Sequence, residues 1–203
     1  MSGHVVDDVA IAAAELRAGR PVVLPTDTVY GVAAPVGDAA AVADIFRRKG
    51  RDGAKPMAVL VADAAQAAVL TDADLGILAD FWPGPLTVVV RRAPGAELNL
   101  GPGVDRLDTV GLRCPDHDLI RALAAEVGPL ATTSANRSGE ATPTTAVEAA
   151  AGLGGDLLAI DGGLCNGVPS TVVDLTVEPA RILREGAIGP AALNAAGLEV
   201  APR

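Results

Sequence analysis

Aromatic residues are scarce in this sequence, which has one Trp, one Tyr and two Phe in 203 residues. Proteins that hold single-stranded nucleic acid stack the bases on aromatic side chains, so the composition argues against that class of function. Half of the residues are hydrophobic, and most of these are Ala, Val and Leu. We therefore expect an aliphatic core packed from many small side chains.

Cysteine and histidine are also rare. The two cysteines, Cys114 and Cys165, have no His or Cys at metal-ligand spacing, and the two histidines, His4 and His117, are isolated in the sequence. Metal sites that depend on these residues need several of them at short, regular spacing. We predict two ordinary reduced thiols and no protein-held metal site.

Long hydrophobic runs and an excess of basic residues are both missing. No apolar run reaches the roughly 20 residues that span a bilayer, and the first residues, MSGHVVDD, are too polar and acidic for a signal peptide. A net charge of −9 argues against tight binding of nucleic acid, which needs a basic surface. We expect a cytoplasmic protein that does not enter membranes and binds tRNA weakly or not at all.

The order of the predicted elements indicates the fold class. Apolar segments typical of strands alternate with segments of helical periodicity, and no linker or change in composition divides residues 1–203. This pattern predicts a single α/β domain with a twisted, mixed parallel and antiparallel sheet. Strands are expected at 21–24, 57–61, 86–91, 109–113, 130–133, 157–160, 171–175 and 181–184. Helices are expected at 7–18, from 38 onward, and at 63–70, 73–81, 116–127, 145–151 and 188–196, and a surface loop at 93–108.

Positive charge is concentrated in one stretch, FRRKGRDGAKPMAVLV, at residues 46–61. It holds five of the sixteen basic residues, including the only two lysines of the chain, Lys49 and Lys55. Glycines break the preceding helix and a proline precedes an apolar strand, which predicts a helix end, a basic loop and a buried strand. The charges can complement the helix dipole in solvent. Alternatively, Lys49, Arg51 and Lys55 bind a polyanion such as a nucleoside triphosphate.

Polar loops follow several predicted strands, and open α/β sheets bind their ligands at such strand ends. PTDTVYG offers two hydroxyls, a carboxylate and a phenol, although Thr-Asp-Thr is also typical of a capped turn. After TSANRSG, the pair Thr142-Pro143 predicts that Thr142 caps the next helix, whose free amides would form an anion site. Ser134, Ser138 and Thr142 could also serve as caps alone.

Two arginines end predicted strands. Arg113 and Arg184 are either solvated or placed to bind a carboxylate or phosphate through both guanidinium nitrogens. The sequence has neither a Walker A loop nor a Rossmann GxGxxG motif. Any nucleotide site is therefore of another kind.

Seven segments of this sequence resemble, in order, the successive motifs of the YrdC/TsaC-like family. They are PTDTVYGVAAPV, KGRDGAKPMAVLV, FWPGPLTVVV, TVGLRCPDH, ATTSANRSGEATPT, GVPSTVVDL and ILREGAI, and the resemblance covers roughly residues 8–195. The resemblance implies a twisted α/β sheet around a basic concave cavity. It also implies the ATP-dependent synthesis of L-threonylcarbamoyladenylate from L-threonine, bicarbonate or CO2 and ATP, with release of pyrophosphate and usually with Mg2+.

The resemblance further implies roles for individual residues. Lys49 and Arg51 match the family's KxR pair and are the expected catalytic residues, while Ser134 and Asn136 match its SxN motif. The implied contacts to threonine are Thr28, Arg113, Thr132 and Ser170. The implied contacts to ATP are Arg51, Lys55, Thr109, Ser134, Asn136, Thr142 and Arg184.

Two positions depart from the family pattern. Asp27 stands where relatives often have Glu, and Leu60 stands where some relatives have a histidine near the threonine. The motifs end with ILREGAI, without the linker and second domain of longer members, so we expect one domain. The product is expected to pass to a tRNA threonylcarbamoyl transferase complex, which forms t6A at adenosine 37.

The implied chemistry fits the residues that the chain contains. Attack of a threonine carbamate on the α-phosphate of ATP needs positioning and charge neutralisation rather than a covalent nucleophile. We assign no general base. Two alternatives stay open: a module that binds structured RNA, against which the net charge argues, and an enzyme that carbamoylates another acceptor.

Overall fold

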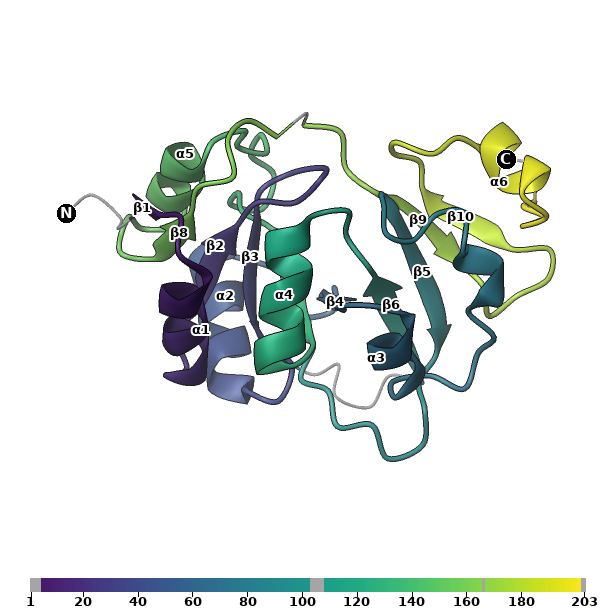
Figure 1. Ribbon diagram of the computed structural model, residues 1–203, viewed down its shortest axis with the longest axis horizontal. Helices are drawn as coiled ribbons and strands as arrows, with labels where there is room; N and C mark the ends of the chain where they lie inside the picture. Colours follow the sequence, from purple (N-terminus) through teal and green to yellow (C-terminus); the bar gives the residue numbers. More distant parts are fainter. Residues whose placement is uncertain (1–4, 103–107, 166, 202–203) are drawn as a thin grey trace.

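The computed structural model describes residues 5–102, 108–165 and 167–201. Within these ranges one ten-stranded sheet has the strand order β1-β8-β2-β3-β7-β4-β6-β5-β9-β10 (Figure 1). The parallel pairs, such as β5 with β9, and the antiparallel pairs, such as β3 with β7, confirm the mixed α/β fold. The strands are β1 (Val5–Val6), β2 (Val22–Leu24), β3 (Gly31–Pro35), β4 (Ala58–Leu60), β5 (Leu86–Arg91), β6 (Thr109–Arg113), β7 (Leu130–Ser134), β8 (Leu158–Ile160), β9 (Thr171–Asp174) and β10 (Arg181–Arg184).

The helices begin at residues whose side chains cap them. Asp8, Asp38, Asp63 and Thr145 each accept a hydrogen bond from a backbone N–H of the first turn, which satisfies a donor that the helix leaves without a partner. The helices are α1 (Val9–Arg17), α2 (Ala39–Lys49), α3 (Ala64–Ala68), α4 (Asp118–Val127), α5 (Ala146–Gly152) and α6 (Pro190–Ala195), with a 3-10 turn η1 (Gly76–Leu78).

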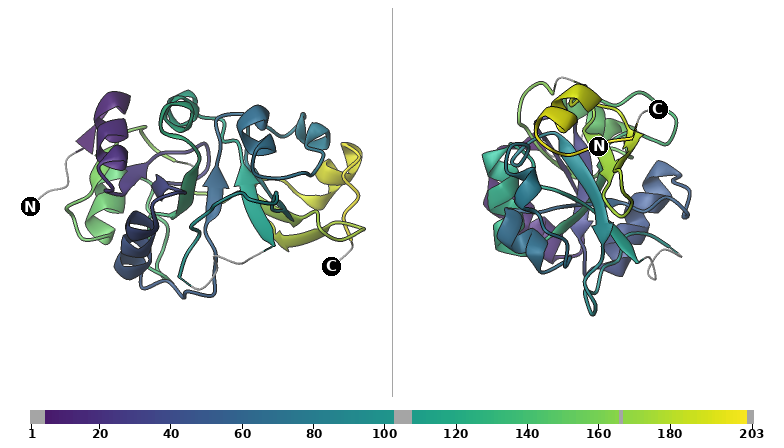
Figure 2. Two further views of the ribbon diagram at one scale, coloured as in Figure 1. Left: turned by 90° about the horizontal axis from the view of Figure 1, so that it is seen from below. Right: turned by 90° about the vertical axis from the view of Figure 1, so that its right-hand side faces the viewer.

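The helices lie on both faces of the sheet (Figure 2). Helices α1, α3 and α4 lie on one face, where Leu16 and Leu123 pack with Leu130 of β7. Helices α2 and α5 lie on the other face and contact β2, β3 and β8. They therefore cover one end of that face. All the strands expected from the sequence are present, with ends that differ by at most one residue.

Helix α2 illustrates how local sequence sets an element that the site depends on. Asp38 caps it, and the apolar stripe of Val42, Ile45 and Phe46 is buried against the sheet. The helix ends at Gly50, which adopts a left-handed conformation with φ of 58° that costs glycine little. The chain leaves the helix directly into the basic loop.

One expectation about elements is wrong. Residues 73–81 contain only the short turn η1 instead of a helix, because the Asp74 carboxylate accepts from Gly76 N and stabilises a local turn. The segment 93–102 is a loop as expected, although its Leu98 and Leu100 are buried. The part of the expected loop at 103–107 lies outside the described residues.

Strand β3 was not expected, because the sequence after PTDTVY has no alternation of apolar and polar residues. It lies in the middle of the sheet, pairs with β2 and β7, and is buried on both faces, which removes the alternation. The last two strands, β9 and β10, are antiparallel neighbours.

Within the described ranges, no helix has the length and apolar character needed to cross a membrane. Cys114 and Cys165 are both free thiols.

Candidate active site

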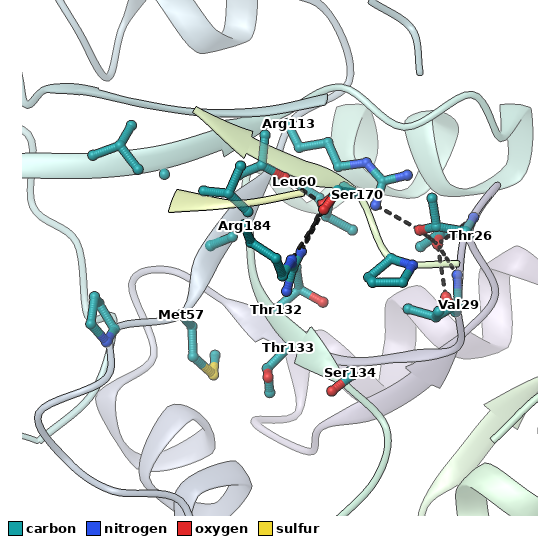
Figure 3. A pocket seen from close by; sticks show the side chains of 18 of the residues that line it. Thr26, Val29, Met57, Leu60, Arg113, Thr132, Thr133, Ser134, Ser170 and Arg184 are labelled. Atoms are coloured by element: carbon teal, nitrogen blue, oxygen red, sulfur yellow. Dashed lines mark hydrogen bonds between the residues drawn. The ribbon is translucent and has the colours of Figure 1, made fainter. Parts of the chain in front are cut away.

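A cavity of about 470 Å³ lies among the strands from β7 to β10 and is also lined by the loop that follows α2 (Figure 3). Its walls come from β4, β5, β6, β7, β9 and β10 and from the loop between β2 and β3. Its charged lining residues are Arg51, Arg113 and Arg184, and no acidic residue of the described chain lines it. The hydroxyl-bearing lining residues are Thr26, Thr28, Thr87, Thr109, Thr132, Thr133, Ser134, Thr142 and Ser170.

Arg113, the last residue of β6, is buried rather than solvated, with 6% of its surface exposed. Its guanidinium donates to Asp27 Oδ1 at 2.5 Å, to Thr28 Oγ1 at 2.8 Å and to the Gly84 carbonyl at 3.1 Å. Burial lowers the pKa of Arg113, and the Asp27 carboxylate opposes that shift. The ion pair of Arg113 with Asp27 holds the guanidinium at this wall of the cavity. Apolar Leu60 is the register partner of Arg113 in the adjacent strand β4.

Thr26 organises the loop between β2 and β3 through its hydroxyl group. Thr26 Oγ1 accepts from Val29 N at 3.1 Å, donates to the Val29 carbonyl at 2.7 Å and contacts Thr28 Oγ1 at 2.9 Å. Both interpretations of the Thr-Asp-Thr sequence therefore apply, since Thr26 caps a turn and Thr28 lines the cavity. The phenol of Tyr30 points elsewhere and donates to the Gly163 carbonyl at 2.8 Å.

Arg184, at the end of β10, forms a second cationic position. Its Nη2 donates to the Ser170 carbonyl at 2.9 Å and to Ser170 Oγ at 3.0 Å, and Ser170 Oγ also contacts Thr87 Oγ1 at 2.9 Å. Burial lowers the pKa of Arg184. Among the described residues no carboxylate lies within ion-pair distance of this guanidinium, so its charge is available to an anion.

Arg51 forms the third position, in the loop after α2. Its guanidinium donates to the Lys55 and Pro56 carbonyls, each at 2.9 Å, and to Thr133 Oγ1 at 3.3 Å, and it lies 5.7 Å from the centroid of the Phe46 ring. Burial lowers the pKa of Arg51, against the influence of Asp52. The backbone of its own loop thus holds the guanidinium at the cavity wall.

Three residues expected at the site are not among the described residues that line the cavity. Lys55 is exposed. Asn136 donates to the carbonyls of Arg137 and Glu140, each at 2.8 Å, and its buried Oδ1 has no hydrogen-bond partner in the described chain. Lys49 is buried, and its ammonium group meets backbone carbonyls instead of the cavity.

The prediction that Thr142 caps the next helix is wrong. The cap of helix α5 lies three residues later, at Thr145, whose Oγ1 accepts from Glu148 N at 3.3 Å, while Glu148 Oε2 accepts from Thr144 N at 3.3 Å. The sequence does contain a capping box, Thr-x-x-Glu at 145–148, which is an alternative helix start to the Thr-Pro pair at 142–143. Thr142 instead reaches the cavity from the loop before that helix.

Thr87 and Thr133 also line the cavity and were not expected there, whereas Thr26 is one of the two hydroxyls singled out in PTDTVYG. Thr87 was visible as the single hydroxyl of the apolar strand LTVVV, and Thr133 as one of three hydroxyls at the end of LATTS. A polar side chain within a buried strand needs a partner or a ligand, and this was the available signal.

The model of the Sua5_yciO_yrdC family, described as "Telomere recombination", matches residues 14–186. The chain belongs to the Sua5/YciO/YrdC family. Among curated relatives, this family member is 41% identical over 190 residues to a putative threonylcarbamoyl-AMP synthase of Mycobacterium leprae, covering 90% of this chain and 84% of the relative. It is 40% identical over 188 residues to threonylcarbamoyl-AMP synthase of Bacillus subtilis, covering 89% of this chain and 54% of the relative.

Among solved structures, the family member resembles Sua5 of Pyrococcus abyssi complexed with L-threonine. The TM-score is 0.87 at 34% identity, and the match covers 100% of this chain and 63% of that one. The chain thus spans most of the mycobacterial relative but only part of the Bacillus and Pyrococcus proteins.

Proposed function

We propose that this protein synthesises L-threonylcarbamoyladenylate from L-threonine, bicarbonate or CO2 and ATP, and releases pyrophosphate. The observation that carries the proposal is a single cavity with three arginines and no described acidic residue, in a chain that matches a threonine-bound relative over its whole length. The reaction joins two anions, a carbamate and a triphosphate, and therefore needs positive charge around both of them.

At one wall, Arg113 would bind the threonine carboxylate. Asp27 and Thr28 fix the orientation of its guanidinium before the substrate arrives, which lowers the entropic cost of binding. Thr132 and Ser170 line the same cavity and offer hydroxyls to threonine. Leu60 gives an apolar surface beside Arg113, suited to a methyl group.

At the other walls, Arg51 and Arg184 would neutralise the phosphates, and Thr109, Ser134 and Thr142 would donate hydrogen bonds to ATP. The threonine nitrogen bonds to the carbon of CO2 and loses a proton, which gives a carbamate. A carbamate oxygen then bonds to the α-phosphorus while the bond from that phosphorus to pyrophosphate breaks. The arginines stabilise the charge that develops during this displacement.

Mg2+ would enter with ATP. The described residues hold no group of three or more His, Cys, Asp or Glu side chains that could ligate a metal, and the described lining offers hydroxyls without carboxylates. These residues fit a cation held chiefly by the triphosphate, where it would neutralise the leaving pyrophosphate.

The acyl adenylate product is reactive toward amines, so we place the reaction before a tRNA threonylcarbamoyl transferase that forms t6A at adenosine 37. We place both steps in the cytoplasm.

The test is pyrophosphate release during incubation with ATP, Mg2+, bicarbonate and each amino acid in turn. We expect release to require L-threonine and bicarbonate together. Serine should be poorer by about 10- to 200-fold, because a missing methyl group in a fitted pocket costs about 1–3 kcal/mol. Equal release after omission of threonine would refute the proposed function.

A further inference from the structure

Lys49 ends helix α2 and turns its side chain into the protein, where 3% of its surface is exposed. Its Nζ donates to the Ser134 carbonyl at 2.5 Å and to the Asn136 carbonyl. In return, the Lys49 carbonyl accepts from Ser138 N at 2.9 Å. The last turn of α2 and the segment 134–138, which we call the serine loop, are therefore joined in both directions.

The serine loop is also held from its other side. Ala135 N donates to the Tyr30 carbonyl at 2.8 Å, which ties the loop to the start of β3. The side chain of Asn136 donates to the Arg137 and Glu140 carbonyls within the same turn. With the carbonyl of Ser134 directed at Lys49, the side chain of Ser134 remains on the cavity wall.

The ammonium group of Lys49 has three N–H donors and can donate to both carbonyls at once. Two carbonyl oxygens converge on it, and charge-assisted hydrogen bonds are stronger than neutral ones. The carbonyl end of α2 adds a favourable dipole. No carboxylate in the described chain lies within ion-pair distance of Nζ, and the charged group that influences the pKa of Lys49 is Arg51, a like charge.

We propose that Lys49 is a positioning residue, whose ammonium group holds the serine loop so that Ser134 faces the nucleotide, without itself contacting the nucleotide. The proposal rests on the proposed function only in taking ATP as the ligand. It differs from the expectation drawn from the sequence, in which Lys49 contacts the phosphates.

The two lysines of the chain allow a test on the wild-type protein. Acetic anhydride acetylates accessible amines, and peptide mass spectrometry separates Lys49 from the exposed Lys55. We expect Lys55 to react readily in the free protein and Lys49 to react slowly both with and without ATP and Mg2+. If Lys49 reacted as fast as Lys55 in the free protein and only ATP protected it, the proposal would be overturned.

Variants test the consequence for the loop. Lys49→Met removes the donor, Lys49→Gln keeps an uncharged N–H donor, and Arg47→Met is the matched control on the exposed side of α2. We expect Lys49→Met to speed amide hydrogen exchange in the serine loop of the nucleotide-free protein. It should also raise the KM for ATP by about 10-fold or more, as loss of charge-assisted hydrogen bonds does. The KM for threonine should change less than about twofold.

Lys49→Gln should recover part of the exchange protection and part of the ATP KM, while Arg47→Met should match the wild type. A higher KM for ATP with unchanged exchange in the free protein would mean that Lys49 touches the nucleotide, and it would refute the positioning role. No change in either quantity would refute it as well. Should Lys49→Met fail to fold, Lys49→Gln and the acetylation of the wild type still test the positioning role of Lys49. Absence of threonine-dependent activity in the wild type would overturn the proposed function, while exchange and acetylation would still report on the loop.

Discussion

The guanidinium of Arg51 donates to carbonyls of its own loop. Because these contacts are local to the loop, we expect the fold to depend little on the charge of Arg51. We expect Arg51→Ala to weaken ATP binding by about 10- to 150-fold, because a charge-assisted hydrogen bond contributes about 1.5–3 kcal/mol. Arg51→Lys should recover only part of the lost ATP affinity, since an ammonium group lacks the planar fork of the guanidinium. Calorimetry of ATP binding measures the loss.

The control for Arg51 is Arg47→Ala, four residues earlier on the exposed side of α2, where an ion pair with Asp44 contributes little. Its ATP affinity and melting temperature should stay near the wild type. If Arg47→Ala were as damaging as Arg51→Ala, the phosphate would lie elsewhere. The expected contact of Lys55 with ATP stays a prediction that the same measurement can address.

The stability of the protein should depend on pH through Lys49. Burial, with Arg51 nearby, lowers the pKa of Lys49 from 10.5 to about 8. Between these two pH values the unfolded chain binds more protons at this residue than the folded one, so the free energy of unfolding rises with pH there, by up to about 1.4 kcal/mol per pH unit. Below about pH 8 the residue is charged in both states and gives no slope.

Urea unfolding at pH 7, 8, 9 and 10 tests this, with Lys49→Met as the reference that cancels the other titrating groups. The wild type should gain stability relative to the variant above about pH 8. Parallel curves for the two proteins across that range would contradict the lowered pKa.

At the scale of elements, the turn after β10 supports the start of β9. A Cβ on Gly186 would lie 2.2 Å from the Pro169 carbonyl oxygen and 2.6 Å from the Ser170 carbonyl carbon. Gly186→Ala must therefore displace Ser170, which Arg184 contacts. We expect a loss of about 1–3 kcal/mol in stability from overpacking together with weaker substrate binding, although residue 186 is not among the cavity-lining residues.

Thermal unfolding and the KM values for threonine and ATP check this prediction. Gly37→Ala is the control, because a Cβ there would meet no atom within 4 Å. A Gly186→Ala protein with normal melting temperature and normal KM values would show that the turn yields without moving β9.

The sequence predicted those elements whose signals are local. The cap at Asp38, the glycine after Lys49 and the apolar stripe between them are enough to place α2. It could not place β3, because a central strand buried on both faces loses its alternation, nor choose between Thr142 and Thr145 as a cap. The same holds for the site. The arginines at strand ends could be recognised from local sequence, but the direction of the Lys49 side chain depends on β7, which lies far along the chain.

At the scale of the whole molecule, the basic character of the cavity contrasts with a net charge of −9. Non-specific affinity for nucleic acid grows with the number of phosphates that a surface neutralises. We therefore expect bare tRNA to bind weakly and without specificity at physiological salt. Filter binding over a range of salt concentrations measures this, and a sub-micromolar complex that resists salt would favour an RNA-binding function instead.

The order of the strands in the sheet has a consequence for how the protein is made. Val5 pairs with Ala159, and Leu86 pairs in parallel with Thr171, so neighbours in space are synthesised far apart in time. Parallel pairing between distant segments is slow, because the chain between them must first be ordered. The cavity takes residues from Thr26 through Arg184, so it is complete only when these distant segments have come together. Activity should therefore appear in one late phase of refolding, when β9 and β10 dock beside β5.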